Sequence, residues 1–378
     1  MNSDAEGHRA ELRRSVLRWI QRTPGAARTR ALRGASPGFE IGVWKEMAQQ
    51  GWLGVMVPDH LGGVGLGLPE AAILAEEFGK ALTPEPLLAA LSLGTSALVH
   101  ARNERLRCGI LPAICAGTQI ASLAWQEASN DLDAIPRLTR IAKNDAGNAR
   151  LSGEKLFVWP VEGVAGFVVS AMATDGVGLY WVPIGAPGLG CTMMERADAS
   201  TVAHLRFADV DINADQIVVE PPFGEAVLRQ TLDEATALAC AEMVGVMKRS
   251  LEISIEYLKM RTQFDRPIGA FQALQHRAVD LYIQQELSAA VVDETIRVLA
   301  ESPKQVARAA AVSRAKARCS DAVVRICREG IQFHGAIGFT DACDIGLYLK
   351  RALVLAAYLG SSTLHRARYA ASAPPEPL

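Results

Sequence analysis

The chain has 378 residues, of which 49% are hydrophobic, so it can bury a substantial core and is expected to form two or three domains. Its 39 lysines and arginines nearly balance 41 aspartates and glutamates, and the net charge of −2 gives no electrostatic basis for binding nucleic acid or an anionic membrane. The seven cysteines are odd in number and form no CxxC pair, which argues against a disulfide framework and predicts reduced thiols in a cytoplasmic protein.

The first third of the chain predicts helices. Residues 9–20 are expected to form an amphipathic helix and not part of a signal peptide, whereas the polar, arginine-rich residues 24–37 are expected to form a loop. Further helices are expected at residues 41–50, 69–78, 86–101 and 104–115. Residues 1–118 are therefore predicted to form an N-terminal α-helical domain, and no membrane span of roughly 20 apolar residues is expected.

The pattern changes near Gln119, where short apolar stretches separated by turn residues begin. Strand-like segments with alternating or continuous apolar character lie at residues 120–125, 138–142, 164–173, 178–182 and 204–210. A turn at Pro221–Gly224 follows the last of them. Residues 119–222 are therefore predicted to form a compact, barrel-like β-domain.

From Glu225 onward the sequence is helical again. Helices are expected at residues 225–259, 271–300, 302–334 and about 343–371. Long helices joined by short links predict an antiparallel four-helix bundle over residues 223–378. The predicted fold class is α+β, with a helical domain, a β-domain and a helical bundle in that order.

The link between the first two bundle helices, within Tyr257–Gln275, combines a helix break with a cation. Pro267 lacks a backbone donor and disfavours helical geometry in the residue before it, so Arg261 is expected near a helix end. A guanidinium binds phosphate oxygens in pairs, which makes Arg261 a candidate pyrophosphate ligand. On spacing alone, a surface arginine beside a helix-breaking turn is the simpler interpretation.

The pattern Tyr-x-x-x-Arg-x-x-Phe-x-x-Pro-Ile-x-x-Phe-Gln-x-x-Gln in this stretch resembles the C-terminal signature of acyl-CoA dehydrogenases, FAD enzymes that desaturate acyl-CoA thioesters. Asp265 occupies a position at which that family usually has glycine. The resemblance covers nearly the whole chain and includes the connector Trp52–Gly65. It implies the domain order predicted above, FAD as cofactor, an acyl-CoA substrate and an electron-transferring flavoprotein as acceptor.

Gln332–Phe339 is similar to the family's Gln-x-x-Gly-Gly-x-Gly loop, which lies against the FAD pyrophosphate of a neighbouring subunit. Glycines let backbone N–H groups approach phosphate oxygens, and Ala336 in place of the second glycine matters only if its φ is positive. In isolation such glycines can simply end a helix, and His334 is expected to be a packed or surface histidine. The FAD contacts that the resemblance implies are Arg261, Phe264, Gln272, Gln332, Gly335, Ala336 and Ser361.

The resemblance also implies that a carboxylate removes an α-proton from the thioester while the β-hydrogen leaves as hydride to the flavin. The family usually carries this base in a Tyr-Glu-Gly-Thr sequence, where the present chain has Leu359. Some members supply it from an earlier helix, at a position that is Ala235 here. Glu242 and Glu234 are the remaining candidates, although a surface or capping role is commoner for such residues. The chain thus resembles a divergent, bacterial-type member that lacks the usual catalytic glutamate.

Contacts with the substrate are also altered. Leu232–Thr236 resembles a Leu-Asp-x-x-Arg sequence that contacts CoA, but threonine replaces the arginine. The resemblance implies substrate contacts from Asp233 and from Ser129, which lies in a shortened loop at Gln126–Asp131. Trp159 stands where the family has a threonine beside flavin N5, so its bulk can obstruct the ring, although an ordinary core aromatic is an equal interpretation.

Three interpretations remain open. The favoured one is a base-lacking subunit of a heteromeric dehydrogenase, which gives Arg261, Gln272 and Gln332 to a cofactor shared across a subunit interface. The alternative is a self-sufficient acyl-CoA dehydrogenase with Glu242 or Glu234 as an atypical base, and the third is a non-enzymatic acyl-CoA-binding scaffold. We expect a homo- or hetero-oligomer, a dimer or tetramer, formed with a related dehydrogenase chain, and no bound metal.

Overall fold

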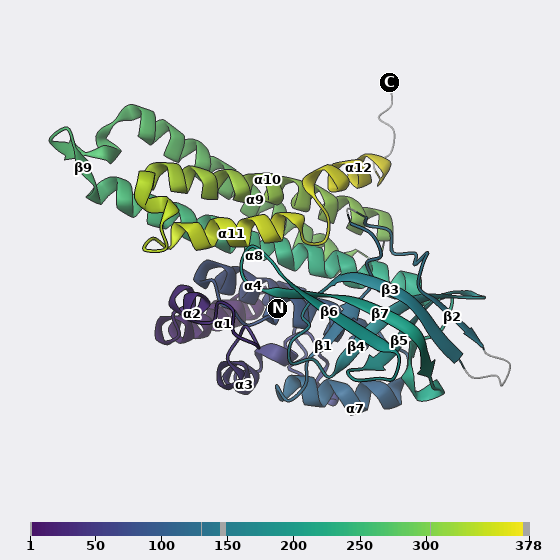
Figure 1. Ribbon diagram of the computed structural model, residues 1–378. Coiled ribbons are helices and arrows are strands. Elements are labelled where there is room, and N and C mark those ends of the chain that lie inside the picture. Colours follow the sequence, from purple (N-terminus) through teal and green to yellow (C-terminus); the bar gives the residue numbers. More distant parts are fainter. Residues whose placement is uncertain (1, 130, 144–148, 303, 373–378) are drawn as a thin grey trace, which may run out of the picture. The chain divides into compact units, whose positions relative to one another are not determined.

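The computed structural model describes residues 2–129, 131–143, 149–302 and 304–372 (Figure 1). The chain forms two compact units, which we call the helical unit and the sheet unit. The helical unit contains Met1–Ala31, Leu68–Pro84 and Thr236–Leu378, and the sheet unit contains Leu32–Gly67 and Glu85–Ala235. Along the chain, helices are followed by strands and then by long helices, which confirms the predicted fold class.

The sheet unit begins with short helices. They are α3 (Ile41–Gln49), η1 (Trp52–Gly54), η2 (Asp59–Leu61), α5 (Leu87–Ala89), η3 (Ala90–Thr95), α6 (Ser96–Val99) and α7 (Glu104–Cys115). Asn103 caps α7, because its side-chain oxygen accepts a hydrogen bond from the N–H of Leu106 at 3.1 Å. The π-helical η3 packs against strand β1 (Ala121–Ala124), and a Cβ atom at Gly94 would lie 2.3 Å from the carbonyl oxygen of Ala121. Glycine is therefore required where this helix meets the strand.

Eight of the described strands form one sheet in the order β6-β7-β3-β2-β4-β5-β8, with β1 paired in parallel to β4 (Figure 1). The remaining elements are β2 (Arg140–Lys143), β3 (Ala149–Val158), β4 (Gly166–Ala173), β5 (Gly176–Pro183), β6 (Leu189–Glu195), β7 (Thr201–Ile212), η4 (Ala214–Gln216) and β8 (Ile217–Val219). β1 and the first six residues of β4 are buried without interruption, which is typical of strands covered on both faces. The centre of this sheet supplies the core of the unit.

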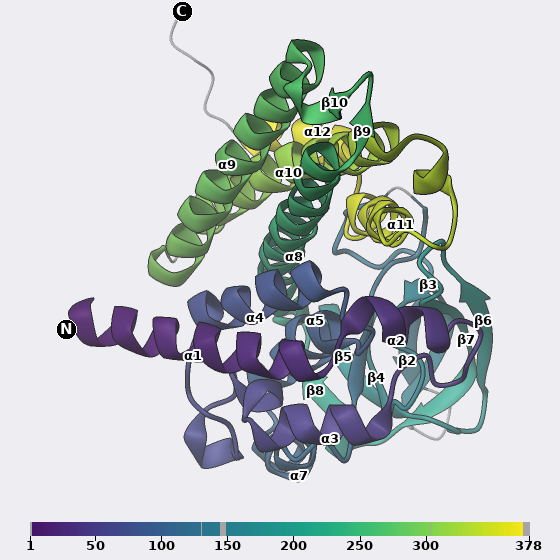
Figure 2. The same cartoon turned by 90° about the vertical axis from the view of Figure 1, so that its left-hand side faces the viewer.

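The helical unit is built around long helices. They are α1 (Asn2–Arg22), α2 (Gly25–Ala31), α4 (Leu68–Ala81), α8 (Gly224–Met260, in this unit from Thr236), η5 (Ile268–Ala270), α9 (Gln272–Glu301), α10 (Gln305–His334), η6 (Gly335–Phe339), α11 (Ile345–Ala357) and α12 (Ser362–Ser372). α10 packs against α9, α11 and α12 (Figure 2). Among the described residues, no helix is both long and apolar enough to cross a membrane.

A short hairpin joins α8 to α9. Its strands, β9 (Thr262–Gln263) and β10 (Arg266–Pro267), pair antiparallel. The turn residues Phe264 and Asp265 have φ angles of 53° and 59°, the left-handed pair of a type I′ turn. Helix α8 therefore ends immediately before Arg261, as the sequence predicts.

Three local predictions were wrong. Part of the expected loop at residues 24–37 forms α2, because Thr29 Oγ1 donates to the carbonyl oxygen of Leu82 at 2.9 Å and the helix packs against the end of α4. The helix expected at residues 343–371 is divided into α11 and α12, because Leu359 and Gly360 have positive φ angles between them. Strands β3, β6 and the three-residue β8 were not predicted, since β3 and β6 carry many polar or exposed residues and β8 is very short.

We expect Asp265→Gly to raise the free energy of unfolding by up to about 1 kcal/mol, because glycine adopts left-handed geometry without the steric cost that a side chain adds. The same exchange at Asp280, an exposed position inside α9, should lower it by roughly 0.3 kcal/mol, because glycine forms helices less well than aspartate. Denaturant unfolding of both variants shows whether the free energy of unfolding of each one is higher or lower than that of the wild type. A destabilised Asp265→Gly variant would mean that the aspartate side chain makes a contact stronger than its backbone strain.

Candidate functional site

Two segments far apart in the sequence meet through stacked rings in the helical unit. The ring of Tyr257, near the end of α8, lies 4.3 Å from the ring of His334, at the end of α10, with an interplanar angle of 27°. His334 is buried, and its Nδ1 lies 2.7 Å from the carbonyl oxygen of Gly330. His334 is therefore a packed histidine that joins the segment with Arg261 to the segment with Gln332.

Arg261 is exposed just beyond the end of α8. Its backbone is held on both sides, because its N–H donates to the carbonyl oxygen of Tyr257 at 2.8 Å and its own carbonyl accepts from the N–H of Ile268 at 2.8 Å. Within the described parts of the chain, no ion pair or side-chain hydrogen bond engages its guanidinium. The backbone thus fixes the position of Arg261, and its guanidinium is accessible to an anion.

The other predicted phosphate contacts also lie on the surface of the helical unit. Gln272 begins α9 and Gln332 lies in the last turn of α10, and both are exposed. Gly335 has a φ of 64° and a ψ of −140°, which residues with a side chain rarely adopt. Ala336 is not among the residues with positive φ, so its methyl group adds no backbone strain at this position of the loop.

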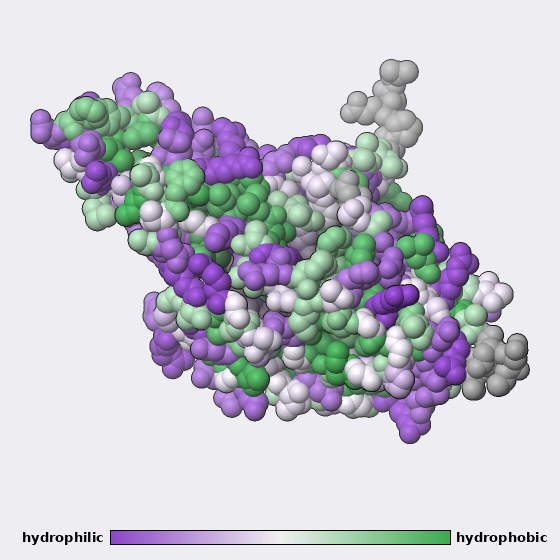
Figure 3. Space-filling view, viewed as in Figure 1, coloured by the Kyte–Doolittle hydropathy of each residue, from purple (hydrophilic) through white to green (hydrophobic). Residues whose placement is uncertain are grey.

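Large apolar side chains project from the hairpin and from η6. Phe264 is 85% exposed and Phe339 is 83% exposed. The edge of the Phe264 ring meets the ring of Phe271 at a centroid distance of 6.0 Å. Figure 3 shows apolar surface beside hydrophilic surface at this end of the helical unit. Exposed aromatic residues of this size indicate a surface that another molecule covers.

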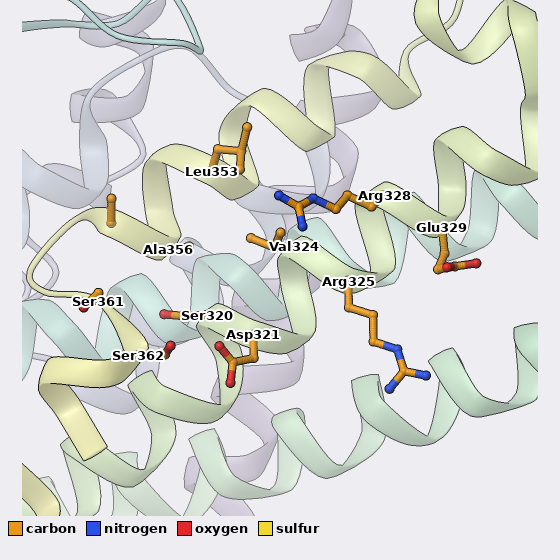
Figure 4. Close-up of a pocket in the computed structure, with 11 residues that line it drawn as sticks. Ser320, Asp321, Val324, Arg325, Arg328, Glu329, Leu353, Ala356, Ser361 and Ser362 are labelled. Atoms are coloured by element: carbon orange, nitrogen blue, oxygen red, sulfur yellow. The ribbon is translucent and has the colours of Figure 1, made fainter. Parts of the chain in front are cut away.

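Ser361 lies in the link between α11 and α12, where its Oγ accepts a hydrogen bond from the N–H of Leu364 at 3.4 Å. It lines a cavity of about 540 Å³ together with Arg325 and Arg328 of α10 (Figure 4). The structure thus groups Ser361 with α10 arginines that the sequence analysis did not single out. Their spacing of three residues, on one face of a helix, was the available signal.

The two residues that the sequence resemblance matches to the family's base are buried and apolar. Ala235 on α8 is 0% exposed, and Leu359 is 5% exposed. Leu359 is also fixed through its backbone, because its carbonyl oxygen lies 2.8 Å from Nε2 of the buried His365. Neither position presents a carboxylate to a ligand.

Glu242, the first alternative base, is held in a buried ion pair. Arg351 of α11 donates from Nε to Glu242 Oε1 at 2.6 Å, and its Nη2 lies 2.5 Å from the same oxygen. The side chains of Glu242 and Arg351 are only 8% and 16% exposed, respectively. A carboxylate in contact with a guanidinium is a weak proton acceptor, because the nearby positive charge favours its ionised form.

Glu234, the second alternative base, lies in a polar cluster of the sheet unit. Ser96 Oγ donates to it at 2.8 Å and Gln230 Nε2 donates to it at 2.9 Å, while His100 Nε2 lies 3.4 Å away. Burial would raise the pKa of Glu234, but the hydrogen bonds and the charge of His100 outweigh burial and lower it. This environment makes Glu234 a weaker base than an ordinary glutamate.

A buried lysine organises the loop that follows β1. Lys155 of β3 is fully buried, and its Nζ donates to Glu127 Oε1 at 2.8 Å. Glu127 also accepts three backbone N–H groups from residues 137–139, at 2.6, 2.7 and 2.9 Å. Burial opposes ionisation of Glu127, but Lys155 and the backbone donors lower its pKa to about 2. One carboxylate therefore holds both ends of the loop.

The predicted substrate contacts differ in exposure. Ser129 is exposed in this loop, whereas Asp233 on α8 is buried. Asn130, in the same loop as Ser129, lies outside the described residues. Among the residues that are described, no three His, Cys, Asp or Glu side chains are grouped to hold a metal ion.

The sequence of the chain is similar to those of known proteins. Residues 6–118 match the family model described as acyl-CoA dehydrogenase, N-terminal domain, and residues 224–373 match acyl-CoA dehydrogenase, C-terminal domain. The chain is 31% identical over 347 residues to acyl-CoA dehydrogenase IpdE2 of Mycobacterium tuberculosis, and the alignment covers 91% of this chain and 90% of that protein. The chain belongs to the acyl-CoA dehydrogenase family.

Solved structures of acyl-CoA dehydrogenases have the same fold. A variant of the Tcur3481-Tcur3483 steroid ACAD superposes with a TM-score of 0.87 at 28% identity, covering 97% of this chain and 98% of that one. The ChsE4-ChsE5 complex from Mycobacterium tuberculosis superposes with a TM-score of 0.88 and covers 98% of each chain. At 24% identity, this second likeness bears on the fold alone.

Trp159, which the sequence resemblance matches to a threonine beside the flavin, is a packed side chain of the sheet unit. It is buried, and the guanidinium carbon of Arg196 lies 4.4 Å from its ring centroid. Arg196 Nε in turn donates to Ser200 Oγ at 2.8 Å. The indole is therefore packed within the sheet unit, with one face covered by a cation.

Lys316 of α10 is a further residue that the sequence analysis missed. It is fully buried, and burial lowers its pKa to about 8. Its Nζ donates, at 2.9 to 3.0 Å, to Ser320 Oγ and to the carbonyl oxygens of Leu355, Ala356 and Gly360. Lys316 thereby caps α11 and fixes the turn that contains Leu359. Several neighbours of Lys316 within Ser313–Ser320 are small, which was the sequence signal that this long side chain could be accommodated in the interior.

We expect Glu242→Gln to lower the free energy of unfolding by about 1–3 kcal/mol, because the buried Arg351 loses its charged partner. Turnover of the assembled enzyme should not change. Glu252→Gln, at a half-exposed ion pair on the same helix, is the matched control and should change stability by less than about 1 kcal/mol. Urea unfolding and acyl-CoA-dependent dye reduction give the two readouts, and a stable but inactive Glu242→Gln variant would make Glu242 the base.

The lowered pKa of Glu127 predicts a pH-dependent contribution to stability. A depressed carboxyl pKa stabilises the fold above the ordinary value of 4.5, and this contribution is lost as the pH falls through about 2. Glu127→Gln should therefore be less stable than wild type at neutral pH, and the difference should narrow below about pH 4.5. Denaturant unfolding at several pH values measures this, with the exposed Glu195→Gln as control. A difference that stays constant on acidification contradicts the assignment.

Proposed function

We propose that this chain is the base-lacking subunit of a heteromeric, FAD-dependent acyl-CoA dehydrogenase that introduces a double bond between the α- and β-carbons of an acyl-CoA thioester. The observation that carries the proposal is the burial of apolar side chains at both usual base positions, Ala235 and Leu359. The proton-abstracting carboxylate then comes from a second, related chain.

FAD is the cofactor of this family, and the helical unit fits its pyrophosphate. Arg261 offers an exposed, unpaired fork within the described residues, and Gln272 and Gln332 offer exposed amides. Gly335 gives the backbone a conformation that lets N–H groups approach phosphate oxygens. When bound, FAD accepts the β-hydrogen as hydride, which no side chain of the protein can do. The proposed task of these residues is to bind and orient the phosphates.

The sheet unit fits the flavin ring less well. Trp159 is buried at the position expected beside the ring, and Arg196 covers one of its faces. These contacts favour a chain that lends phosphate contacts to a cofactor whose ring is held by its partner. The exposed hydrogen-bond donors of Arg261, Gln272 and Gln332 argue against a scaffold that binds no cofactor.

The self-sufficient alternative is less well supported, because it depends on Glu242 or Glu234. Glu242 is engaged by Arg351 at 2.5 Å, and the surroundings of Glu234 lower its pKa. A carboxylate in contact with a guanidinium and a carboxylate whose pKa is lowered are both poor general bases near neutral pH.

The relatives suggest a partner and a substrate class to test. The structural relative at 28% identity is a steroid ACAD whose name joins two designations, Tcur3481 and Tcur3483. We propose the same two-chain organisation here, Asp233 and Ser129 as contacts with the substrate, and a steroid-derived acyl-CoA as the first substrate to assay. An electron-transferring flavoprotein is the proposed electron acceptor.

The chain purified alone should contain little or no FAD and should not reduce a dye with acyl-CoA. Coexpressed with a related dehydrogenase chain that keeps the Tyr-Glu-Gly-Thr glutamate, it should copurify as a yellow, active complex. Arg261→Gln in this chain should weaken FAD binding by at least about tenfold, because a charge-assisted fork to phosphate is lost. Arg105→Gln, at an exposed position on α7, is the control. Yellow, active protein from this chain alone contradicts the proposal.

A further inference from the structure

The glycine-bearing turn η6 continues into residues 340–344, which connect it to α11 and which we call the η6 link. Within this segment, Thr340 donates to the carbonyl oxygen of Ile337 from its N–H at 3.0 Å and from its Oγ1 at 2.7 Å. Bonds between residues so close in sequence shape the segment but cannot place it against other helices. Its first end is placed by α10, because a Cβ atom at Gly338 would lie 2.9 Å from the carbonyl oxygen of Ile331. Its far end needs a separate contact.

Helix α2 is held closely against the end of α4. A Cβ atom at Gly25 would lie 2.2 Å from the carbonyl oxygen of Ala81, and Thr29 Oγ1 donates to the carbonyl oxygen of Leu82 at 2.9 Å. Gly25 and Thr29 are four residues apart, so the same face of α2 meets α4 at both points. α2 is therefore a fixed base for the side chain that follows Thr29.

That side chain, Arg30, reaches the η6 link. Its Nη1 donates to Asp344 Oδ1 at 2.5 Å, and its Nε lies 3.8 Å from Asp341 Oδ1. The Arg30 side chain is only 25% exposed, and its Nε and Nη2 are shielded from solvent. Water and salt screen a shielded ion pair less than a surface pair. Arg30 therefore ties the far end of the η6 link to α2.

Helix α11, which follows the link, has its own attachments. Tyr348 Oη donates to the carbonyl oxygen of Lys80 at 2.8 Å, which joins α11 to α4. Ile345 and Leu347, at the start of α11, are buried. Loss of the Arg30 contact is therefore expected to loosen the η6 link and η6 while α11 stays packed.

We propose that Arg30 is a positioning residue for the cofactor phosphates. Through Asp344 it holds the η6 link, and with it the backbone N–H groups at Gly335 and Ala336, in the place where they meet the phosphates. This inference rests on the proposed function, in which those groups bind the FAD pyrophosphate. A loop that is already held in its binding conformation binds more tightly, because less of the chain has to be ordered when the ligand arrives.

Amide hydrogen exchange of the chain tests whether Arg30 holds the link. In Arg30→Gln, the hydrogen-bonded amides of Thr340 and Cys343 should exchange at least about threefold faster than in the wild type, while those of α11 should not change. Asp344→Asn should have the same effect, and the double variant should add little, because each change removes the same contact. Arg9→Gln, which removes an ion pair with Glu70 in the same unit, is the matched control and should leave these amides unchanged.

The Kd for FAD tests whether the held link serves the cofactor. It is measured on the coexpressed complex or, if the chain alone proves yellow, on that chain. Arg30→Gln should weaken FAD binding about threefold to tenfold, and Arg30→Lys, which keeps the positive charge, should weaken it less. Arg9→Gln should leave the Kd within about twofold. Thermal unfolding of each variant reports stability separately, and Asp344→Asn replaces Arg30→Gln if the latter does not fold.

The outcomes separate this inference from the proposed function. Unchanged exchange in both Arg30→Gln and Asp344→Asn overturns the inference, and so does faster exchange with an unchanged Kd for FAD, which would leave Arg30 a structural role only. An equal loss of FAD affinity in Arg9→Gln also overturns it. These three results leave the proposed function standing. A wild-type protein that binds no FAD, alone or in the complex, overturns both.

Discussion

The buried Lys316, whose three N–H groups face four oxygen acceptors, is the constraint on which the C-terminal half of the helical unit depends. Three backbone carbonyls at the end of α11 and in the following turn accept from its Nζ, and a charged group without water needs all of them. These bonds end α11, turn the chain into α12 and hold Leu359 inward. The residue that the sequence resemblance matches to the family's base is thus apolar in this chain and held by the turn that Lys316 fixes.

The buried and exposed charges of the chain have different tasks. Three buried or half-buried carboxylates are engaged: Glu242 by Arg351, Glu127 by Lys155, and Glu234 by a cluster of hydroxyl, amide and imidazole groups. On the helical unit, by contrast, Arg261, Arg314, Arg325 and Arg328 have no ion-pair partner among the described residues. The carboxylates therefore maintain the fold, while these arginines are available to phosphate or to a second chain.

The proposal that the active site is divided between two chains accounts for this combination. The family's scaffold depends on helix packing and on the sheet, and neither requires the base. Under this proposal a second, related chain supplies the base.

The sequence by itself determined the order of helices, sheet and bundle, the end of α8 before Arg261, and the absence of a carboxylate at residues 235 and 359. These features are local: they depend on periodicity, on Pro267 and on which residue occupies a matched position. The tertiary structure decided the environments of the candidate residues. Arg351 lies 109 positions from Glu242, and the loop held by Glu127 depends on Lys155 of another strand. The burial of Lys316 and the cavity lined by Ser361 likewise arise only when distant segments pack together, because burial and ion pairing are properties of neighbours in space.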